Sequence, residues 1–188
     1  MKVLRAADYK IMPWKNGMGS TTEIAISPAD ATLENFVWRI SMAQVASDGP
    51  FSSFAAIDRT LLVLEGNGLD LSVANQPVTR ITRETIHSFP GDQPTSARLV
   101  DGSIVDLNVM SRRKIVMHDV RRIKLNGRQD FIVSTQTILI VEQGGLDIVA
   151  PTPAKRLGER DAIVVDTSTP TLVLNAGEAT QVIAIQFR

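Results

Sequence analysis

The chain has 188 residues, of which 44% are apolar and 21% charged, so it can bury a sizeable core as one domain or two small ones. Its 20 basic and 20 acidic side chains give zero net charge, which argues against nucleic-acid binding as a main role. Cysteine is absent, which excludes disulfides and thiolate chemistry, and no signal-peptide core or bilayer-spanning apolar run is present, which predicts a cytoplasmic protein without a membrane partner.

Short segments typical of strands follow one another along the chain, and residues 28–36 allow a helical turn or two at most. In residues 36–42, strand geometry places Val37, Arg39 and Ser41 on one face and the large apolar side chains on the other. By the same alternation, Asp106, Asn108 and Met110 share a face. Further strands are predicted at 61–64, 138–141, 163–165, 172–174 and 182–185.

The segment 111–124 lies between the two halves of the chain and carries six basic residues. We interpret it as a solvated crossover that includes His118 as a surface residue. An edge that binds anions is the alternative interpretation.

An internal repeat with a spacing of 77 residues decides the fold class. Residues 61–71 read LLVLEGNGLDL and residues 138–148 read ILIVEQGGLDI, and the register continues without a gap to 83–86 against 160–163. This spacing is too long for a solenoid repeat of roughly 20–50 residues and suits a small β-domain. Many short strands joined by glycine-rich turns predict an all-β sandwich or barrel in each half.

The repeated turn and the step at 158–165 resemble the cupin barrel. The resemblance implies a bicupin, with two double-stranded β-helix (jelly-roll) barrels that arose by duplication. Metal-dependent cupins place histidines and a glutamate in the strand before the first glycine turn, where they converge on a divalent metal. The corresponding residues 51–60 contain no histidine, and the whole chain has only His87 and His118. We therefore expect neither a metal nor another cofactor, and no catalytic residue is assigned.

Polar segments that have no counterpart in the second half carry a more specific resemblance. They are P-W-K-N-G-x-G-x-T-x-E-I at 13–24, W-R-x-S at 38–41, D-G-P-F-S at 48–52, D-R at 58–59, L-E-G-x-G at 64–68 and D-x-N-V-M at 106–110. Together, in this order, they resemble the HutD/Ves family of bicupins. One departure is Ala55-Ala56, which stands where the family usually has Pro-Gly, and it bears on the choice of ligand.

The resemblance implies an accessory or regulatory protein of histidine utilisation that binds a small carboxylate such as N-formyl-L-glutamate. Arginine offers a planar fork that suits carboxylates, and amides, hydroxyls and aromatic walls would complete such a site. The expected ligand-binding residues are Trp14, Lys15, Asn16, Arg39, Ser41, Phe51, Arg59, Asn108 and Met110. For Arg59, a simple ion pair with Asp58 or Glu65 is the alternative, while Thr21 and Glu23 are expected to brace the N-terminal loop.

The predicted domains are 1–115, a barrel that holds the ligand pocket, and 116–188, a barrel that serves mainly as scaffold. We expect the halves to exchange strands and to form one compact unit. Two other functions stay open. One is a cupin enzyme (isomerase, lyase or hydrolase) using Glu23, Asp106 or His87 as acid or base. The other is a homodimeric structural or stress-response protein, since exposed sheet edges tend to be covered.

Overall fold

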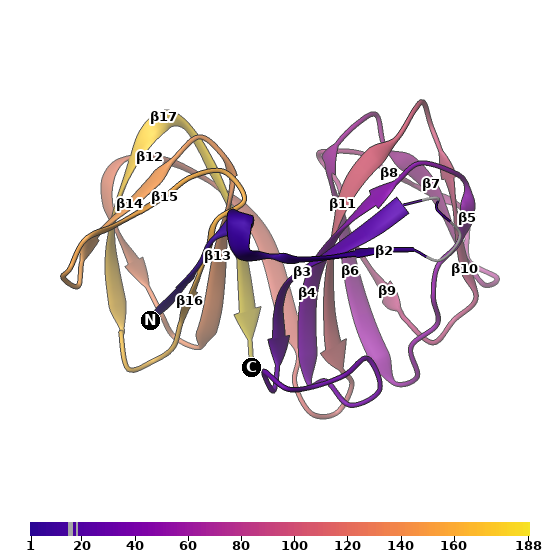
Figure 1. Ribbon diagram of the computed structural model, residues 1–188, viewed down its shortest axis with the longest axis horizontal. Helices are drawn as coiled ribbons and strands as arrows, with labels where there is room; N and C mark the ends of the chain where they lie inside the picture. The colour runs from indigo at the N-terminus through magenta and orange to yellow at the C-terminus, as the bar shows by residue number, and fades with distance from the viewer. Residues whose placement is uncertain (15–16, 18) are drawn as a thin grey trace. The chain divides into compact units, whose positions relative to one another are not determined.

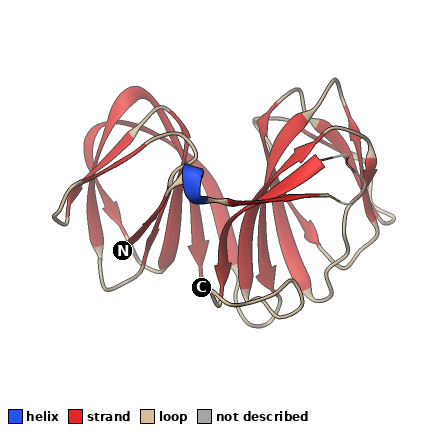
Figure 2. Ribbon diagram, viewed as in Figure 1, coloured by secondary structure: helices blue, strands red, loops and turns tan. Residues whose placement is uncertain are grey.

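The computed structural model describes residues 1–14, 17 and 19–188, and almost all of its regular structure is β-strand, as Figure 2 shows. An all-β fold is therefore confirmed. The strands are β1 (Lys2–Leu4), β2 (Lys10–Pro13), β3 (Gly19–Ser27), β4 (Trp38–Val45), β5 (Gly49–Pro50), β6 (Ile57–Glu65), β7 (Leu69–Val73), β8 (Thr79–Ile81), β9 (Ile86–Pro90), β10 (Thr95–Leu99), β11 (Ile104–Arg112), β12 (His118–Ile132), β13 (Gln136–Gln143), β14 (Leu146–Ala150), β15 (Lys155–Leu157), β16 (Ala162–Val165) and β17 (Thr171–Phe187) (Figure 1). The described part of the chain contains no helix long enough to cross a membrane.

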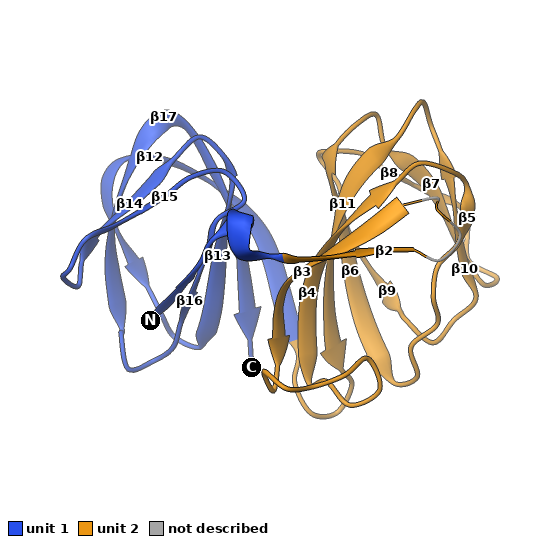
Figure 3. Ribbon diagram, in the orientation of Figure 1, with its two compact units in different colours: residues 1–9, 118–188 blue, residues 10–117 orange. Residues whose placement is uncertain are grey.

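The chain divides into two compact units, coloured separately in Figure 3: residues 10–117, and residues 1–9 together with 118–188. The second boundary lies two residues from the predicted one. The first nine residues belong to the C-terminal unit, contrary to the predicted division, because β1 pairs with β16 and Arg5 forms an ion pair with Asp161. A 3-10 turn at Ala6–Asp8, which the sequence pattern did not predict, follows β1.

Two sheets pack face to face in unit 2, the unit formed by residues 10–117. The larger sheet has the order β2-β3-β4-β11-β6-β9 and the smaller has the order β5-β10-β7-β8. Side chains from both sheets form one apolar core, which includes Val63 and Leu71. Burial of such side chains is the main stabilising contribution, at about 2 kcal/mol for each. The hydrophobic faces of the two sheets thus enclose a common interior.

The C-terminal unit contains one long strand, β17, that pairs with β13 near its end and with β14 near its start. The predicted strands at 172–174 and 182–185 are therefore two parts of the same strand. The strand β12 runs along β17 on its other edge and begins at His118, so residues 118–124 of the predicted crossover belong to this sheet. His118 is half-buried beside Phe187, and Arg122 forms a largely buried ion pair with Glu142.

The internal repeat is visible in the strand pairing of the two units. Leu61 faces His87 between β6 and β9, and the residues 77 positions later, Ile138 and Val164, face each other between β13 and β16. The duplication therefore builds the same strand pairing twice. His87 occupies a position that the second copy fills with an aliphatic side chain, which supports a packing role for this position.

Candidate functional site

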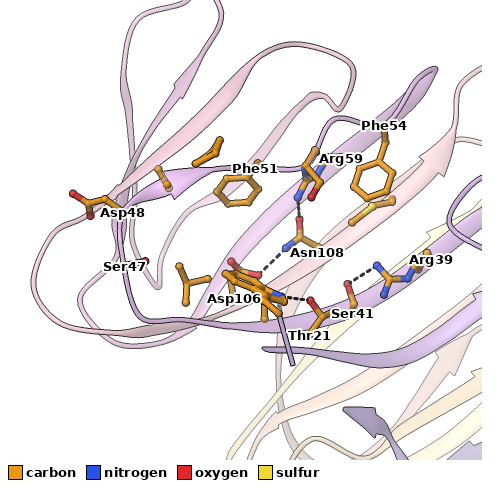
Figure 4. A pocket seen from close by; sticks show the side chains of 18 residues that line it. Thr21, Arg39, Ser41, Ser47, Asp48, Phe51, Phe54, Arg59, Asp106 and Asn108 are labelled. Atoms are coloured by element: carbon orange, nitrogen blue, oxygen red, sulfur yellow. Dashed lines mark hydrogen bonds between the residues drawn. The ribbon is translucent and has the colours of Figure 1, made fainter. Parts of the chain in front are cut away.

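A cavity of about 530 Å³ opens inside unit 2, between the inner face of the larger sheet and the loop that follows β5 (Figure 4). Apolar atoms make up most of its wall, and a few polar side chains converge on it, which is the usual character of a small-molecule site. The residues that line it are Trp14, Thr21, Arg39, Ser41, Ala43, Val45, Ser47, Asp48, Gly49, Pro50, Phe51, Ser52, Phe54, Arg59, Ala97, Asp106, Asn108 and Met110.

The polar side chains reach the cavity because adjacent strands place them in register. Arg39 of β4 and Arg59 of β6 both face Met110 of β11, so the three residues form one row across the sheet. Neighbouring strands lie about 4.8 Å apart, which puts the two arginine backbones about 10 Å from each other. Ser41 and Asn108 form part of the next row. The predicted alternation in both segments is therefore correct.

Arg59 is 4% exposed and is held from several sides. Its Nη2 donates to Asn108 Oδ1 and its Nη1 donates to the carbonyl oxygen of Ser52 at 3.2 Å. The guanidinium carbon lies 4.9 Å from the ring centre of Phe51 and 5.8 Å from that of Phe54, distances at which aromatic faces attract a cation. Burial lowers its pKa to about 10, which leaves it charged at neutral pH. The alternative of an ion pair with Asp58 or Glu65 is not what the structure shows.

Arg39 is equally buried and has an acidic partner. Its Nε donates to Glu23 Oε2 at 2.8 Å, and its Nη1 lies 3.4 Å from Ser41 Oγ. Glu23 comes from β3, and the pair fixes the guanidinium at the wall of the cavity. Glu23 was expected to brace the N-terminal loop, whereas the residue it holds in the structure is Arg39 of β4.

Asp106 lies at the floor of the cavity and is fully buried. Its Oδ1 accepts a hydrogen bond from Asn108 Nδ2 at 2.7 Å, and Asn108 in turn accepts from Arg59 (Figure 4). Its Oδ2 has no hydrogen-bond partner among the described residues. Burial raises the pKa of Asp106 to about 7, although the charge of Arg59, the hydrogen bond from Asn108 and the backbone amide of Ala43 oppose this increase. The carboxyl group is therefore poised to gain or lose a proton near neutral pH.

Trp14 forms part of the cavity wall and is fixed by a hydrogen bond from its Nε1 to Thr21 Oγ1 at 2.8 Å. Gly19 makes this position possible. A Cβ at residue 19 would lie 2.2 Å from the carbonyl oxygen of Gln44 and 2.8 Å from the indole ring. The glycine therefore permits close packing of the indole against β4.

Seven of the nine predicted site residues line this one cavity: Trp14, Arg39, Ser41, Phe51, Arg59, Asn108 and Met110. The predictions for Lys15 and Asn16 lie outside the described residues. Trp38, one of the large side chains on the opposite face of the predicted strand, is buried.

Other lining residues were missed as ligand contacts, above all Asp106, Thr21 and Phe54. Asp106 could have been found from its alternation with Asn108 and Met110, which places all three on one face. No sequence signal distinguishes Phe54.

Ala55 and Ala56, which stand where the family usually has Pro-Gly, lie in the loop beside this cavity. Ala56 has a φ of 57°, the left-handed conformation that glycine adopts most easily, and its carbonyl oxygen accepts the amide of Arg113 at 2.8 Å. The turn is thus kept without the glycine, at a cost of about 1–2 kcal/mol for the Cβ.

We expect Ala56→Gly to raise the free energy of unfolding by about 0.5–1 kcal/mol, because the relieved strain exceeds the added freedom of the unfolded chain. The neighbouring substitution Ala55→Gly, at a position with ordinary φ, should instead lower it. Urea unfolding of both variants measures the difference, and equal effects of the two substitutions would contradict the strained turn.

The described residues contain no group of three histidine, aspartate or glutamate side chains placed to hold a metal ion. His87 packs against Phe89 with the ring centres 6.1 Å apart, and burial lowers its pKa. The cavity holds two buried arginines and only one buried carboxyl group, and such a donor set does not suit a divalent cation.

The HutD family model matches residues 6–184, which is nearly the whole chain. The chain belongs to the HutD family. A protein of Pseudomonas putida described as an uncharacterized 21.2 kDa protein in the hutC 3' region is 39% identical over 110 residues, and Protein Ves of Citrobacter koseri is 36% identical over 110 residues. These matches span 57% and 56% of the two relatives, respectively, and 58% and 56% of this chain.

Solved structures extend the comparison to the full length of this HutD family member. HutD from Pseudomonas fluorescens SBW25 has a TM-score of 0.81 and 32% identity, covering 100% of this chain and 98% of that one. A cupin 2 conserved barrel domain protein from Leptotrichia buccalis has a TM-score of 0.61 at 8% identity, covering 98% of this chain and all of that one. The latter similarity concerns the fold alone, and with the former it shows that the chain has a cupin-like fold.

Proposed function

We propose that this HutD family member binds a small dicarboxylate in the cavity of unit 2, with one carboxylate beside Arg39 and the other beside Arg59. The observation that carries the proposal is the row formed by these two buried arginines across β4, β11 and β6. Buried guanidinium groups attract carboxylates strongly, because little water competes for them. Both arginines line the same cavity, so a single ligand with two carboxylates can contact both of them.

N-formyl-L-glutamate is the ligand we propose, and the protein would act as an accessory or regulatory component of histidine utilisation in the cytoplasm, without a resident metal. The name of the Pseudomonas putida relative places its gene beside hutC, and the Pseudomonas fluorescens HutD structure is described as a formate condition. A formyl group shares its carbonyl oxygen and small size with formate. A volume of about 530 Å³ is ample for a ligand of this size.

We expect Arg39→Met to weaken binding of N-formyl-L-glutamate at least tenfold, because the substitution removes the donor fork at one end of the cavity. Isothermal titration calorimetry measures the affinity, and a thermal-shift assay provides a second readout, since a ligand that binds only the folded state raises the melting temperature. The matched control is Arg98→Met, an exposed arginine of β10 in the same unit. Equal affinities in both variants would contradict the proposal.

A second candidate function is acid-base catalysis on the same ligand class. The observation that favours it is Asp106, a buried carboxyl group in the cavity with a pKa raised to about 7, as general acids and bases require. Hydrolysis would add water to the formyl carbon, break the C–N bond and release formate and glutamate. Proton NMR of N-formyl-L-glutamate incubated with the protein distinguishes the two functions: binding alone leaves the formyl signal unchanged, whereas catalysis produces free formate.

A further inference from the structure

The two carboxyl oxygens of Asp106 differ in their hydrogen bonding. Asn108 donates to Oδ1, whereas Oδ2 has no hydrogen-bond partner among the described residues, although the side chain is completely buried and lines the cavity. A buried polar atom left without a partner costs about 1–3 kcal/mol. An oxygen in this position is therefore suited to contact a bound ligand (Figure 4).

The charges that face Asp106 come from three strands. Arg59 of β6 is the cation that acts on Asp106. Arg39 of β4 lines the same cavity and forms an ion pair with Glu23 of β3. Across the strands, Asp106 is paired with Ala43 and Val63, whose side chains carry no charge, and the backbone amide of Ala43 also lowers its pKa.

The other carboxylate that lines the described part of the cavity is Asp48. It is exposed to solvent and accepts the amide of Leu99, so its charge is screened. Arg39 and Arg59 together carry two positive charges, and Glu23 neutralises one of them. If Asp106 were also ionised, no net positive charge would remain to attract a ligand with two negative charges.

We propose that binding of a dicarboxylate is coupled to the uptake of one proton by Asp106, whose Oδ2–H then donates a hydrogen bond to an oxygen of the ligand. The inference rests on the proposed function, since it concerns the same cavity and ligand class. Protonation removes a negative charge that would repel the ligand, and it also converts a partnerless acceptor into a donor. Asp106 thereby selects ligands that present a carbonyl or carboxylate oxygen over those that present an N–H group.

The coupling can be measured because Asp106 changes its protonation near neutral pH in the protein without ligand. Its pKa of about 7 in the unliganded protein means that it is mostly ionised at pH 8 and mostly protonated at pH 6. A ligand that binds the protonated form therefore takes up nearly one proton at pH 8 and almost none at pH 6. The affinity should fall up to tenfold for each pH unit above about 7. An ionised Asp106 that accepted a ligand N–H would give the opposite sign.

The test is isothermal titration of the full-length protein with N-formyl-L-glutamate at pH 6, 7 and 8, each in HEPES and in Tris. These buffers differ in ionisation enthalpy, so the difference in heat gives the number of protons taken up. We expect this number to rise from near zero to near one over this range. Asp106→Asn keeps the acceptor for Asn108 and presents a permanent N–H donor, so it should show no uptake and an affinity independent of pH. The control is Asp30→Asn, an exposed residue, which should behave as the wild type does.

Proton release, the absence of uptake at pH 8, or equal uptake in Asp106→Asn would overturn the proton coupling while leaving the binding function intact. Failure of the wild-type protein to bind at any of the three pH values would overturn the binding function and the coupling together. If Asp106→Asn does not fold, the proton count of the wild-type protein decides the question by itself.

Discussion

Arg59→Met is expected to abolish measurable binding of N-formyl-L-glutamate, with a loss of at least 100-fold in affinity. The side chain is held by Asn108, by the carbonyl of Ser52 and by two aromatic rings, so its guanidinium is already positioned before a ligand enters. Positioned donors lose little entropy on binding, which makes their removal costly. Isothermal titration at pH 6.5 measures the affinity directly.

The same substitution should lower the free energy of unfolding by about 2–4 kcal/mol. Without Arg59, the buried oxygen of Asn108 lacks its donor and Asp106 loses the cation that opposes its pKa increase. Arg59→Lys restores the charge but not the planar fork, so it should recover much of the stability and little of the affinity. Wild-type affinity in Arg59→Met would show that this arginine serves the fold alone.

Asp106→Asn is expected to remove most of the pH dependence of stability in unit 2. The pKa of Asp106 is raised from an ordinary value of 3.8 to about 7, so between these values the folded chain holds a proton that the unfolded chain has released. The free energy of unfolding of the wild-type protein therefore decreases as pH rises through this window and levels off above pH 7. The change is at most about 4 kcal/mol, from about 1.4 kcal/mol for each pKa unit.

The asparagine cannot ionise, so the variant should be more stable than the wild-type protein at pH 8, by about 2 kcal/mol, after allowance for its own imperfect hydrogen bonding. Urea unfolding followed by tryptophan fluorescence is suitable, because both tryptophans, Trp14 and Trp38, lie in unit 2. The control Asp30→Asn removes an exposed carboxylate and should preserve the slope. A parallel pH dependence in wild type and Asp106→Asn would show that other groups control it.

The sequence was sufficient to predict the all-β fold and the strand residues that line the cavity, because both depend on strand alternation. The faces of β4 and β11 followed from the two-residue period, which placed Arg39 with Ser41 on one face and Asn108 with Met110 on another. The repeat likewise predicted related β-structures in the two halves, and the equivalent pairing of β6 with β9 and of β13 with β16 agrees with it. Local periodicity determines which face a side chain occupies.

Long-range partners could not be predicted in the same way. That β1 would pair with β16, more than 150 residues away, depends on which sheet edge is open in the folded unit. The hydrogen bonds of Arg59 with Asn108 and Ser52 depend on loop geometry and not on sequence neighbours, so Asp58 and Glu65 were equally plausible partners beforehand. The importance of Asp106 also became visible only with its burial, since desolvation raises its pKa.

The central claim is that one dicarboxylate occupies the cavity of unit 2 between Arg39 and Arg59. A crystal structure of the protein grown with N-formyl-L-glutamate tests it most directly. We predict one ligand in each chain, with its two carboxylates beside the two guanidinium groups and an oxygen within hydrogen-bond distance of Asp106 Oδ2. A ligand bound elsewhere, for example in the hollow lined by Asp147, Asn175 and Thr180 of the other unit, with the cavity of unit 2 filled only by solvent, would contradict the account.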